Sequence, residues 1–228
     1  DLLDEGAGTR DAIGVAAQAA YLGADLNTGA DWDRTTVSLQ VPVRTLPAAL
    51  DLMADVALRP DFHTADVDKH RGLRLAEILQ RRDVPGAVAS LVSNALIFPA
   101  GHPYHASTDG DSASTAQIDS ATVRRFYERL SDPRHATVIV TGDITLAQAR
   151  ALIARRFGGW KTHAPTPAPP AAPPAPVSRP TTLFLVDKPG AAQSVIVIGS
   201  PGVSRLSPDY YAIEVMNTIL GGSFSSRL

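Results

Sequence analysis

The chain has 228 residues, of which 44% are hydrophobic, and this is enough to bury a sizeable core in one large or two modest domains. Its 21 basic and 23 acidic side chains give a formal charge of −2, with no basic block and only 6% aromatic residues, which excludes the electrostatic pattern of a nucleic-acid-binding protein. The absence of cysteine excludes disulfides and thiolate metal sites without choosing a compartment, and no apolar run approaches the roughly 18–20 residues of a membrane helix.

The first residues of the chain predict a turn that leads into a helix. Thr9 or Asp11 can cap this helix and Gly23 can end it. From Asp33 to Val43 the apolar side chains alternate, which indicates a half-buried strand, so a helical layer over a sheet is expected. The chain begins inside an acidic turn and stops shortly after the glycine pair Gly221-Gly222, where a new element would start. We therefore interpret it as a fragment. The predicted inward face of the helix holds Ile13, Ala16, Ala17, Ala20 and Ala24.

Helical spacing of apolar residues continues through the middle of the chain. Pro47 suits the first turn of a helix, whereas Pro60 and Pro85 are expected to stop the helices that precede them. A further helix begins at Thr115 or Asp119, after a loop that is long enough to carry function. Helices are therefore predicted over residues 47–59, 64–82, 86–98, 119–130, 145–157 and 208–220.

Three short apolar, β-branched segments predict strands, and a proline-rich stretch divides the chain. Residues 136–142 indicate a buried strand, and residues 181–186 and 194–198 indicate two more. Between them, residues 164–180 contain mostly Pro and Ala, which favours an extended linker. We therefore predict an α+β fold with a mixed, mainly antiparallel sheet layered with helices over residues 1–163, the linker at 164–180, and the start of a second, similar domain at 181–228.

Candidate chemical groups are sparse. His102 and His105 are three residues apart, but Pro103 breaks a helix there and no third metal ligand is nearby, so a solvated loop in which one imidazole bonds backbone is favoured. Ser223, Ser225 and Ser226 fit neither a nucleophile elbow nor a phosphate-binding loop. His70 and Glu77 lie two turns apart on one helix face, about 10 Å at 1.5 Å per residue, too far to bind one zinc together.

Eight short phrases, in this order and spacing, resemble the insulinase or pitrilysin family of zinc metallopeptidases, which includes mitochondrial processing peptidases and respiratory-complex core subunits. The resemblance covers nearly the whole chain and implies two domains of similar α+β fold. The phrases are residues Leu3 to Arg10, Leu22 to Asn27, Leu58 to Phe62, His102 to Tyr104, Thr141 to Asp143, Gly158 to Trp160, Val186 to Ser194 and Leu220 to Leu228.

The resemblance also implies where a zinc site would lie. The family's signature is His-x-x-Glu-His followed roughly seventy-six residues later by a Glu, in which both His and the distal Glu bind zinc and the Glu between them acts as general base. Laying residues Leu3 to Gly6 on the phrase after that motif puts Asp1 where the last His should be, and Glu77, 76 residues further on, where the distal ligand would lie. Glu77 is therefore the one metal-ligand candidate, and no residue of the chain is assigned a catalytic role.

Such a chain resembles the half of the family that lacks a complete zinc motif. The resemblance then implies a non-catalytic half that shapes a peptide-binding chamber, with unfolded peptides and a catalytic half of the same or a partner chain as partners, a dimer, and zinc present in the family but not bound here. Peptide would add to a strand edge that includes Leu26, Asn27 and Thr28, although Gly29 weakens that strand. An ordinary edge strand without ligand, an active zinc endopeptidase with ligands upstream of Asp1, and a structural core-type subunit remain alternatives. The location is left open between periplasm and cytoplasm, with the periplasm favoured.

Overall fold

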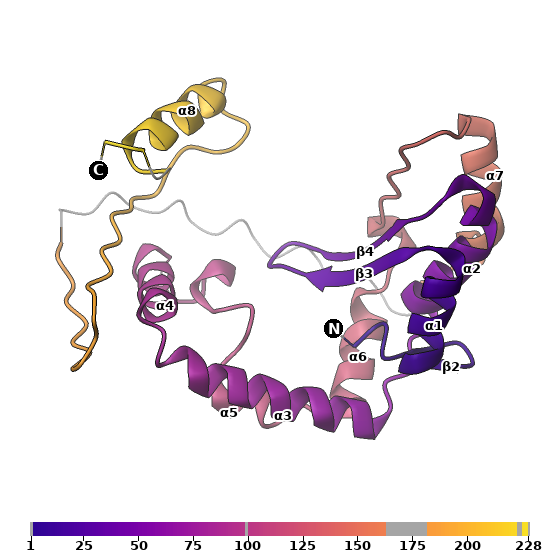
Figure 1. Ribbon diagram of the computed structural model, residues 1–228, viewed down its shortest axis with the longest axis horizontal. Helices are drawn as coiled ribbons and strands as arrows, with labels where there is room; N and C mark the ends of the chain where they lie inside the picture. Colours follow the sequence, from indigo (N-terminus) through magenta and orange to yellow (C-terminus); the bar gives the residue numbers. More distant parts are fainter. Residues whose placement is uncertain (1, 99, 163–181, 223–224, 228) are drawn as a thin grey trace.

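The structure is a computed structural model that describes residues 2–98, 100–162, 182–222 and 225–227. It confirms the α+β class, but helices dominate, and the sheets among the described residues are two antiparallel pairs of short strands (Figure 1). No helix in these ranges combines the length and apolarity needed to cross a bilayer. The predicted linker at 164–180 lies outside the described residues.

The opening segment forms a tight two-stranded turn that is attached to a later loop. β1 (Gly6–Ala7) pairs with β2 (Arg10–Asp11), and the turn between them needs Gly8, whose φ of +67° is left-handed. The Gly8 N–H donates to the carbonyl of Arg59, and the N–H of Asp61 donates to the carbonyl of Gly6, at 2.9 and 2.7 Å. These hydrogen bonds place the start of the chain on the loop that follows α2 (Leu46–Leu58).

Helix α1 (Ala12–Leu22) has the predicted caps but not the predicted inward face. Asp11 accepts a hydrogen bond from the Gly14 N–H at 2.8 Å, and Gly23 ends the helix in the left-handed conformation. Val15 and Leu22 are buried, whereas Ile13 is 78% exposed. Ala16, Ala17 and Ala20 are also exposed. The inward-face prediction is wrong because the helix is apolar on all sides, so that periodicity alone could not select one face.

A small core joins α1, α2 and a two-stranded ribbon. The ribbon consists of β3 (Asp25–Ala30) and β4 (Thr35–Gln40), which are antiparallel with Leu26 opposite Leu39 and Thr28 opposite Val37. Ala7, Val15, Leu52 and Val56 form the buried cluster, and Leu3, Ala19, Leu26 and Val37 pack against it. Full burial of Leu52 and Val56 contributes about 1.5–3 kcal/mol each.

A buried carboxylate fastens this core to the opening turn. Asp55, on α2, is 8% exposed and forms ion pairs with Arg10, at 2.8 Å, and with Arg59. A Cβ atom on Gly8 would lie 3.1 Å from the Asp55 Oδ2 atom, so the turn also needs glycine for space. The two guanidinium groups compensate the buried charge.

The next helix in the chain leads away from this core. α3 (Thr64–Arg81) connects the end that holds α1 and α2 to the end that holds α4 (Pro85–Ile97), as Figure 1 shows. Of the two cap candidates Thr115 and Asp119, the structure selects Asp119, whose side chain accepts from the Thr122 N–H, and the helix predicted from residue 145 is capped by Thr145, which accepts from the Gln148 N–H. The other elements are short helical turns at Val43–Thr45, Pro103–His105 and Pro133–His135, then α5 (Ser112–Thr115), α6 (Ser120–Leu130), α7 (Leu146–Phe157) and α8 (Tyr210–Leu220).

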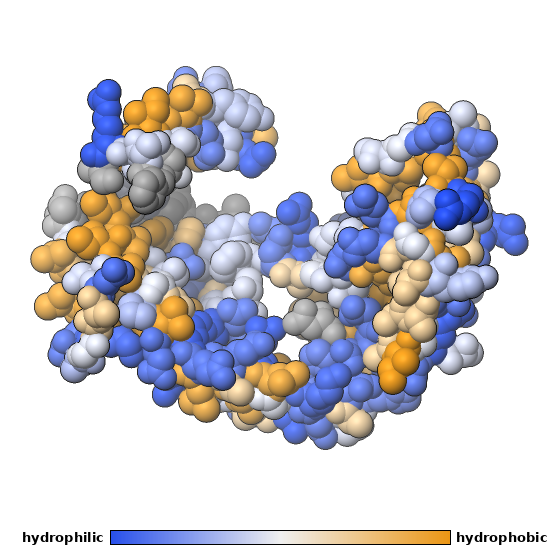
Figure 2. Space-filling model, in the orientation of Figure 1, coloured by the Kyte–Doolittle hydropathy of each residue, from blue (hydrophilic) through white to orange (hydrophobic). Residues whose placement is uncertain are grey.

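Three predicted strands are wrong. Residues 136–142, 182–186 and 194–198 belong to no strand in the described parts of the chain. Ile139 is 84% exposed and Leu183 is 93% exposed, so the segments are not buried either. Apolar surface accordingly gathers over the side of the molecule that holds residues 182–198 and α8 (Figure 2). A β-strand requires a hydrogen-bonded neighbour, and propensity by itself does not supply one.

Candidate functional site

The three residues predicted to bind substrate lie together on β3. Leu26 is half-buried against the core, and the Thr28 hydroxyl donates to a carboxylate oxygen of Asp4 at 3.0 Å. Asn27 is exposed, and its side-chain amide donates to Asp25 at 2.9 Å. Because side chains alternate along a strand, Leu26 and Thr28 face the body of the protein and Asn27 faces away.

β3 has a strand partner on one side only. Its ladder with β4 uses the hydrogen-bonding groups on that side, and no other strand pairs with β3 among residues 2–98, 100–162, 182–222 and 225–227. Alternate N–H and C=O groups on the other side are therefore directed at an open edge, to which an extended peptide can add. Gly29 does not end the strand, since it pairs with Thr36 and β3 continues to Ala30.

The far end of the ribbon is attached to the loop after α4. The Tyr104 hydroxyl donates to the Asp33 carboxylate, with distances of 2.8 and 2.9 Å to its two oxygens, and the Trp32 indole N–H donates to the Ala106 carbonyl at 3.0 Å. The Trp32 and Tyr104 rings lie 5.6 Å apart. The hydrogen bond to Asp33 is the main cause that raises the pKa of Tyr104 above 10.0, so the hydroxyl remains a donor at neutral pH.

The two histidines of that loop have structural partners. The His102 Nδ1 atom accepts from the Tyr104 N–H at 3.0 Å, and the His105 Nδ1 atom lies 2.7 Å from the Phe98 carbonyl oxygen. The His102 ring also lies against Phe98, with ring centres 4.7 Å apart. The prediction that an imidazole here bonds backbone is confirmed.

Glu77 lies on α3 in surroundings that do not suit zinc. Its side chain is 61% exposed and forms an ion pair with Arg74 at 3.1 Å, and Arg74 also lies 3.3 Å from Asp109. A guanidinium group at this distance repels a divalent cation. Within the described residues, no three His, Cys, Asp or Glu side chains gather where they could hold a metal. Asp1 lies outside those residues, so the assignment of Glu77 as a ligand stays a prediction.

The structure brings together a carboxylate and an imidazole that the sequence analysis did not connect. Glu5 lies 2.7 Å from the Nε2 atom of His70 and 2.9 Å from the Lys69 ammonium group. The hydrogen bond from Lys69 is the largest cause that lowers the pKa of Glu5, and His70 adds to it. The His70 contact is close but is not aligned as a hydrogen bond. The trio attaches the opening turn to α3; no sequence pattern signals it, because Glu5 precedes Lys69 by 64 residues.

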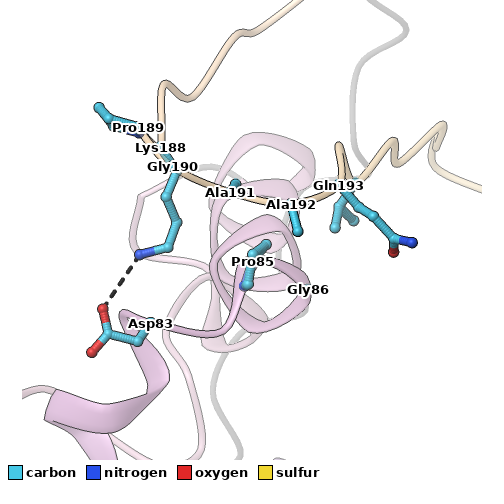
Figure 3. Close-up of a pocket in the computed structure, with 10 residues that line it drawn as sticks. Asp83, Pro85, Gly86, Lys188, Pro189, Gly190, Ala191, Ala192 and Gln193 are labelled. Carbon is cyan, nitrogen blue, oxygen red and sulfur yellow. Dashed lines mark hydrogen bonds and ion pairs between the residues drawn. The ribbon is translucent and has the colours of Figure 1, made fainter.

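A hollow of about 570 Å³ lies between the start of α4 and residues 188–195 (Figure 3). Its one ammonium group, on Lys188, donates to the Arg82 carbonyl at 3.0 Å and lies 3.3 Å from Asp83. Gln193 points away from Lys188 and Asp83. The polar groups do not converge on a point that a ligand could occupy, so the β3 edge is the stronger candidate site.

Two domains of one peptidase family match this chain, each over a different part of it. "Insulinase (Peptidase family M16)" matches residues 2–97, and "Peptidase M16 inactive domain" matches residues 117–228. An uncharacterized zinc protease of Streptomyces coelicolor is 30% identical over the whole of this chain, which covers 50% of that protein. Subunit 1 of the bovine mitochondrial cytochrome b-c1 complex is 23% identical over 88% of this chain and 41% of its own length. The chain spans about half the length of the curated relatives it matches.

Solved structures share the fold. The crystal structure of a peptidase M16 inactive domain from Pseudomonas fluorescens has a TM-score of 0.80 and 26% identity, covering 99% of this chain and 54% of that one. Pitrilysin has a TM-score of 0.60 and 19% identity over 74% of this chain and 19% of its own, which is a likeness of fold. These neighbours are larger proteins, of which the present chain corresponds to a part.

Proposed function

Since this chain belongs to the insulinase (M16) family of peptidases, we propose that it is a non-catalytic half that binds extended peptide along β3 and presents it to a zinc-bearing half. The observation that carries the proposal is the geometry of β3. Its outer edge pairs with no strand in the parts of the chain that the structure describes, its base packs on the core through Leu26, and its far end is attached to the loop after α4. A strand edge held in this way recognises peptide through main-chain hydrogen bonds, which tolerate many sequences.

The surroundings of Glu77 support the non-catalytic part of the proposal. The Arg74 guanidinium lies 3.1 Å from one carboxylate oxygen of Glu77, and its positive charge disfavours a zinc ion beside that oxygen. The match of residues 117–228 to a domain described as inactive points in the same direction. In this proposal the catalytic zinc and its general base belong to another half of the assembly, and the present half contributes the strand edge.

Two alternatives differ from this proposal in their metal content and partners. An active zinc site in this half would hold zinc through Glu77, so Glu77→Ala would remove zinc from the intact protein. A structural subunit is favoured by the similarity to the bovine cytochrome b-c1 complex subunit. Such a subunit would bind no extended peptide, so the peptide-binding experiment below separates it from the proposed function.

The test uses a dye-labelled heptapeptide, Lys-Thr-Val-Thr-Val-Thr-Lys, and two N-methylated forms of it. Peptide addition to a strand edge uses the N–H groups of alternate residues. One form therefore carries N-methyl groups on the second, fourth and sixth residues, and the other on the third and fifth. We expect the parent and one methylated form to bind the intact protein with similar Kd, and the other form to bind at least about tenfold more weakly.

The position of binding is read by hydrogen exchange. The parent peptide should slow exchange at the amides of residues 25–30 and leave that of α7 unchanged. Equal binding of both methylated forms would contradict strand addition. No binding of the parent peptide would exclude the proposed function and favour the structural subunit.

A further inference from the structure

The tip of the β3–β4 ribbon has a different support from its base. At the base, Leu26 and Val37 pack on the buried cluster. Beyond them, Gly29 and Ala30 are exposed, and a Cβ atom on Gly29 would meet nothing within 4 Å. A two-stranded ribbon without a covering layer is marginally stable in water. The outer half of the candidate edge therefore needs another source of order.

That order comes from a clamp made by four residues, Trp32 and Asp33 of the ribbon turn and Tyr104 and Ala106 of the loop after α4. Two hydrogen bonds and one ring contact cross it. In Figure 1 the ribbon projects from α1 and α2 toward α4, with its tip beside this loop. The clamp thus connects elements that are more than 70 residues apart in the sequence.

Both sides of the clamp are themselves fixed. On the loop side, the Tyr104 ring lies edge-on to Phe98, with ring centres 5.4 Å apart. On the ribbon side, Asp31 accepts from the N–H groups of Asp33 and Arg34 at 2.8 and 3.0 Å, which sets the turn. Because the groups on both sides are already ordered, the hydrogen bond between Tyr104 and Asp33 fixes the position of the ribbon tip relative to the loop. A hydrogen bond between two mobile groups would not do this.

We propose that Tyr104 and Trp32 are positioning residues for peptide binding: they hold the ribbon tip so that the β3 edge is ordered before a peptide arrives. The inference rests on the proposed function. Neither side chain has to touch the peptide. A peptide that adds to a loose strand must also order that strand, which lowers its affinity, and a clamp on the tip removes this cost.

The experiment compares hydroxyl removal at two tyrosines of the intact protein. Tyr104→Phe deletes the donor to Asp33 and keeps the ring contacts. We expect it to raise the Kd of the heptapeptide about fivefold and to speed hydrogen exchange over residues 25–40 without peptide. Tyr21→Phe is the matched control, because Tyr21 is 85% exposed on α1, and it should change neither.

Two substitutions of Asp33 test the same hydrogen bond from its acceptor side. Asp33→Asn keeps an oxygen that can accept from Tyr104 and should stay close to wild type, whereas Asp33→Ala should match Tyr104→Phe. The double variant Tyr104→Phe, Asp33→Ala should have nearly the same Kd as either single variant, since both substitutions remove the same hydrogen bond. Trp32→Phe, which removes the indole N–H donor and leaves a smaller ring, should raise exchange in the same residues.

The outcomes separate the two proposals. If the heptapeptide binds and Tyr104→Phe leaves both its Kd and the exchange of residues 25–40 unchanged, the clamp inference is overturned. The same follows if exchange rises and Kd does not. If wild type binds no peptide at residues 25–30, the proposed function fails, and the positioning role fails with it; faster exchange in Tyr104→Phe would then report a purely structural clamp.

Discussion

The beginning and the end of the described chain contain the same kinds of apolar residue in opposite environments. Residues 2–62 bury Val15, Leu52 and Val56 between two helices and a ribbon. In residues 182–198, by contrast, Leu183, Leu185 and Ile196 are each more than 80% exposed. Both segments have the composition of a core. The difference shows that an apolar pattern becomes a core only where a second layer covers it.

The largest expected effect tests the buried side of this comparison. Leu52→Ala removes a side chain that is 1% exposed and should lower the free energy of unfolding by about 2–5 kcal/mol. Leu183→Ala makes the same chemical change at an exposed position and should alter it by less than about 0.5 kcal/mol. Urea unfolding of both variants measures the difference. A loss at Leu183 as large as that at Leu52 would mean that residues 182–198 are covered in solution.

An intermediate effect is expected at the buried carboxylate. Asp55→Ala leaves Arg10 and Arg59 without their shared partner and should lower the free energy of unfolding by about 1–3 kcal/mol. Asp187→Ala, at an exposed position in the other region, should be close to neutral. The same urea titrations report both. Equal losses in the two variants would show that the ion pairs of Asp55 contribute no more to the free energy of unfolding than the exposed Asp187 does.

The smallest expected effect depends on pH. The pKa of Glu5 is lower in the folded protein, so its ionised form stabilises the fold above about pH 4.5, and this stabilisation is lost as the pH falls through the lowered pKa. Glu5→Gln should therefore be less stable than wild type at pH 7, by less than about 1 kcal/mol, and the gap should narrow as the pH falls below about 4.5. Asp83→Asn, whose partner Lys188 lies at the exposed hollow, should show no such gap. A gap for Glu5→Gln that stays the same as the pH is lowered would show that the shape of the side chain, and not its charge, causes the effect.

Local signals predicted the helices well and the sheets poorly. Gly23, Asp119 and Thr145 act as caps within a few residues of the backbone groups they satisfy, so their roles follow from nearby sequence. A strand depends on a partner that local sequence does not name. Residues 35–40 pair with β3, whereas residues 136–142, with similar β-branched composition, have no strand partner in the described parts.

The candidate site, too, was predictable from the sequence only in part. Leu26, Asn27 and Thr28 were placed by the resemblance of a short phrase, and the structure puts them on one open strand edge. The contact between Tyr104 and Asp33 could not be predicted, because 71 residues separate its partners and no local pattern connects them.

By itself, the sequence determined the family, the α+β class, most helix bounds and a short choice of capping residues, since these depend on short phrases and on hydrogen bonds within one turn. Tertiary structure decided which face of α1 is buried, which apolar segments are covered, and that Arg10 pairs with Asp55 while Tyr104 holds the ribbon at Asp33. These outcomes depend on which distant surfaces meet. Burial and ion pairing act through space, and a local pattern does not specify the neighbour that completes them.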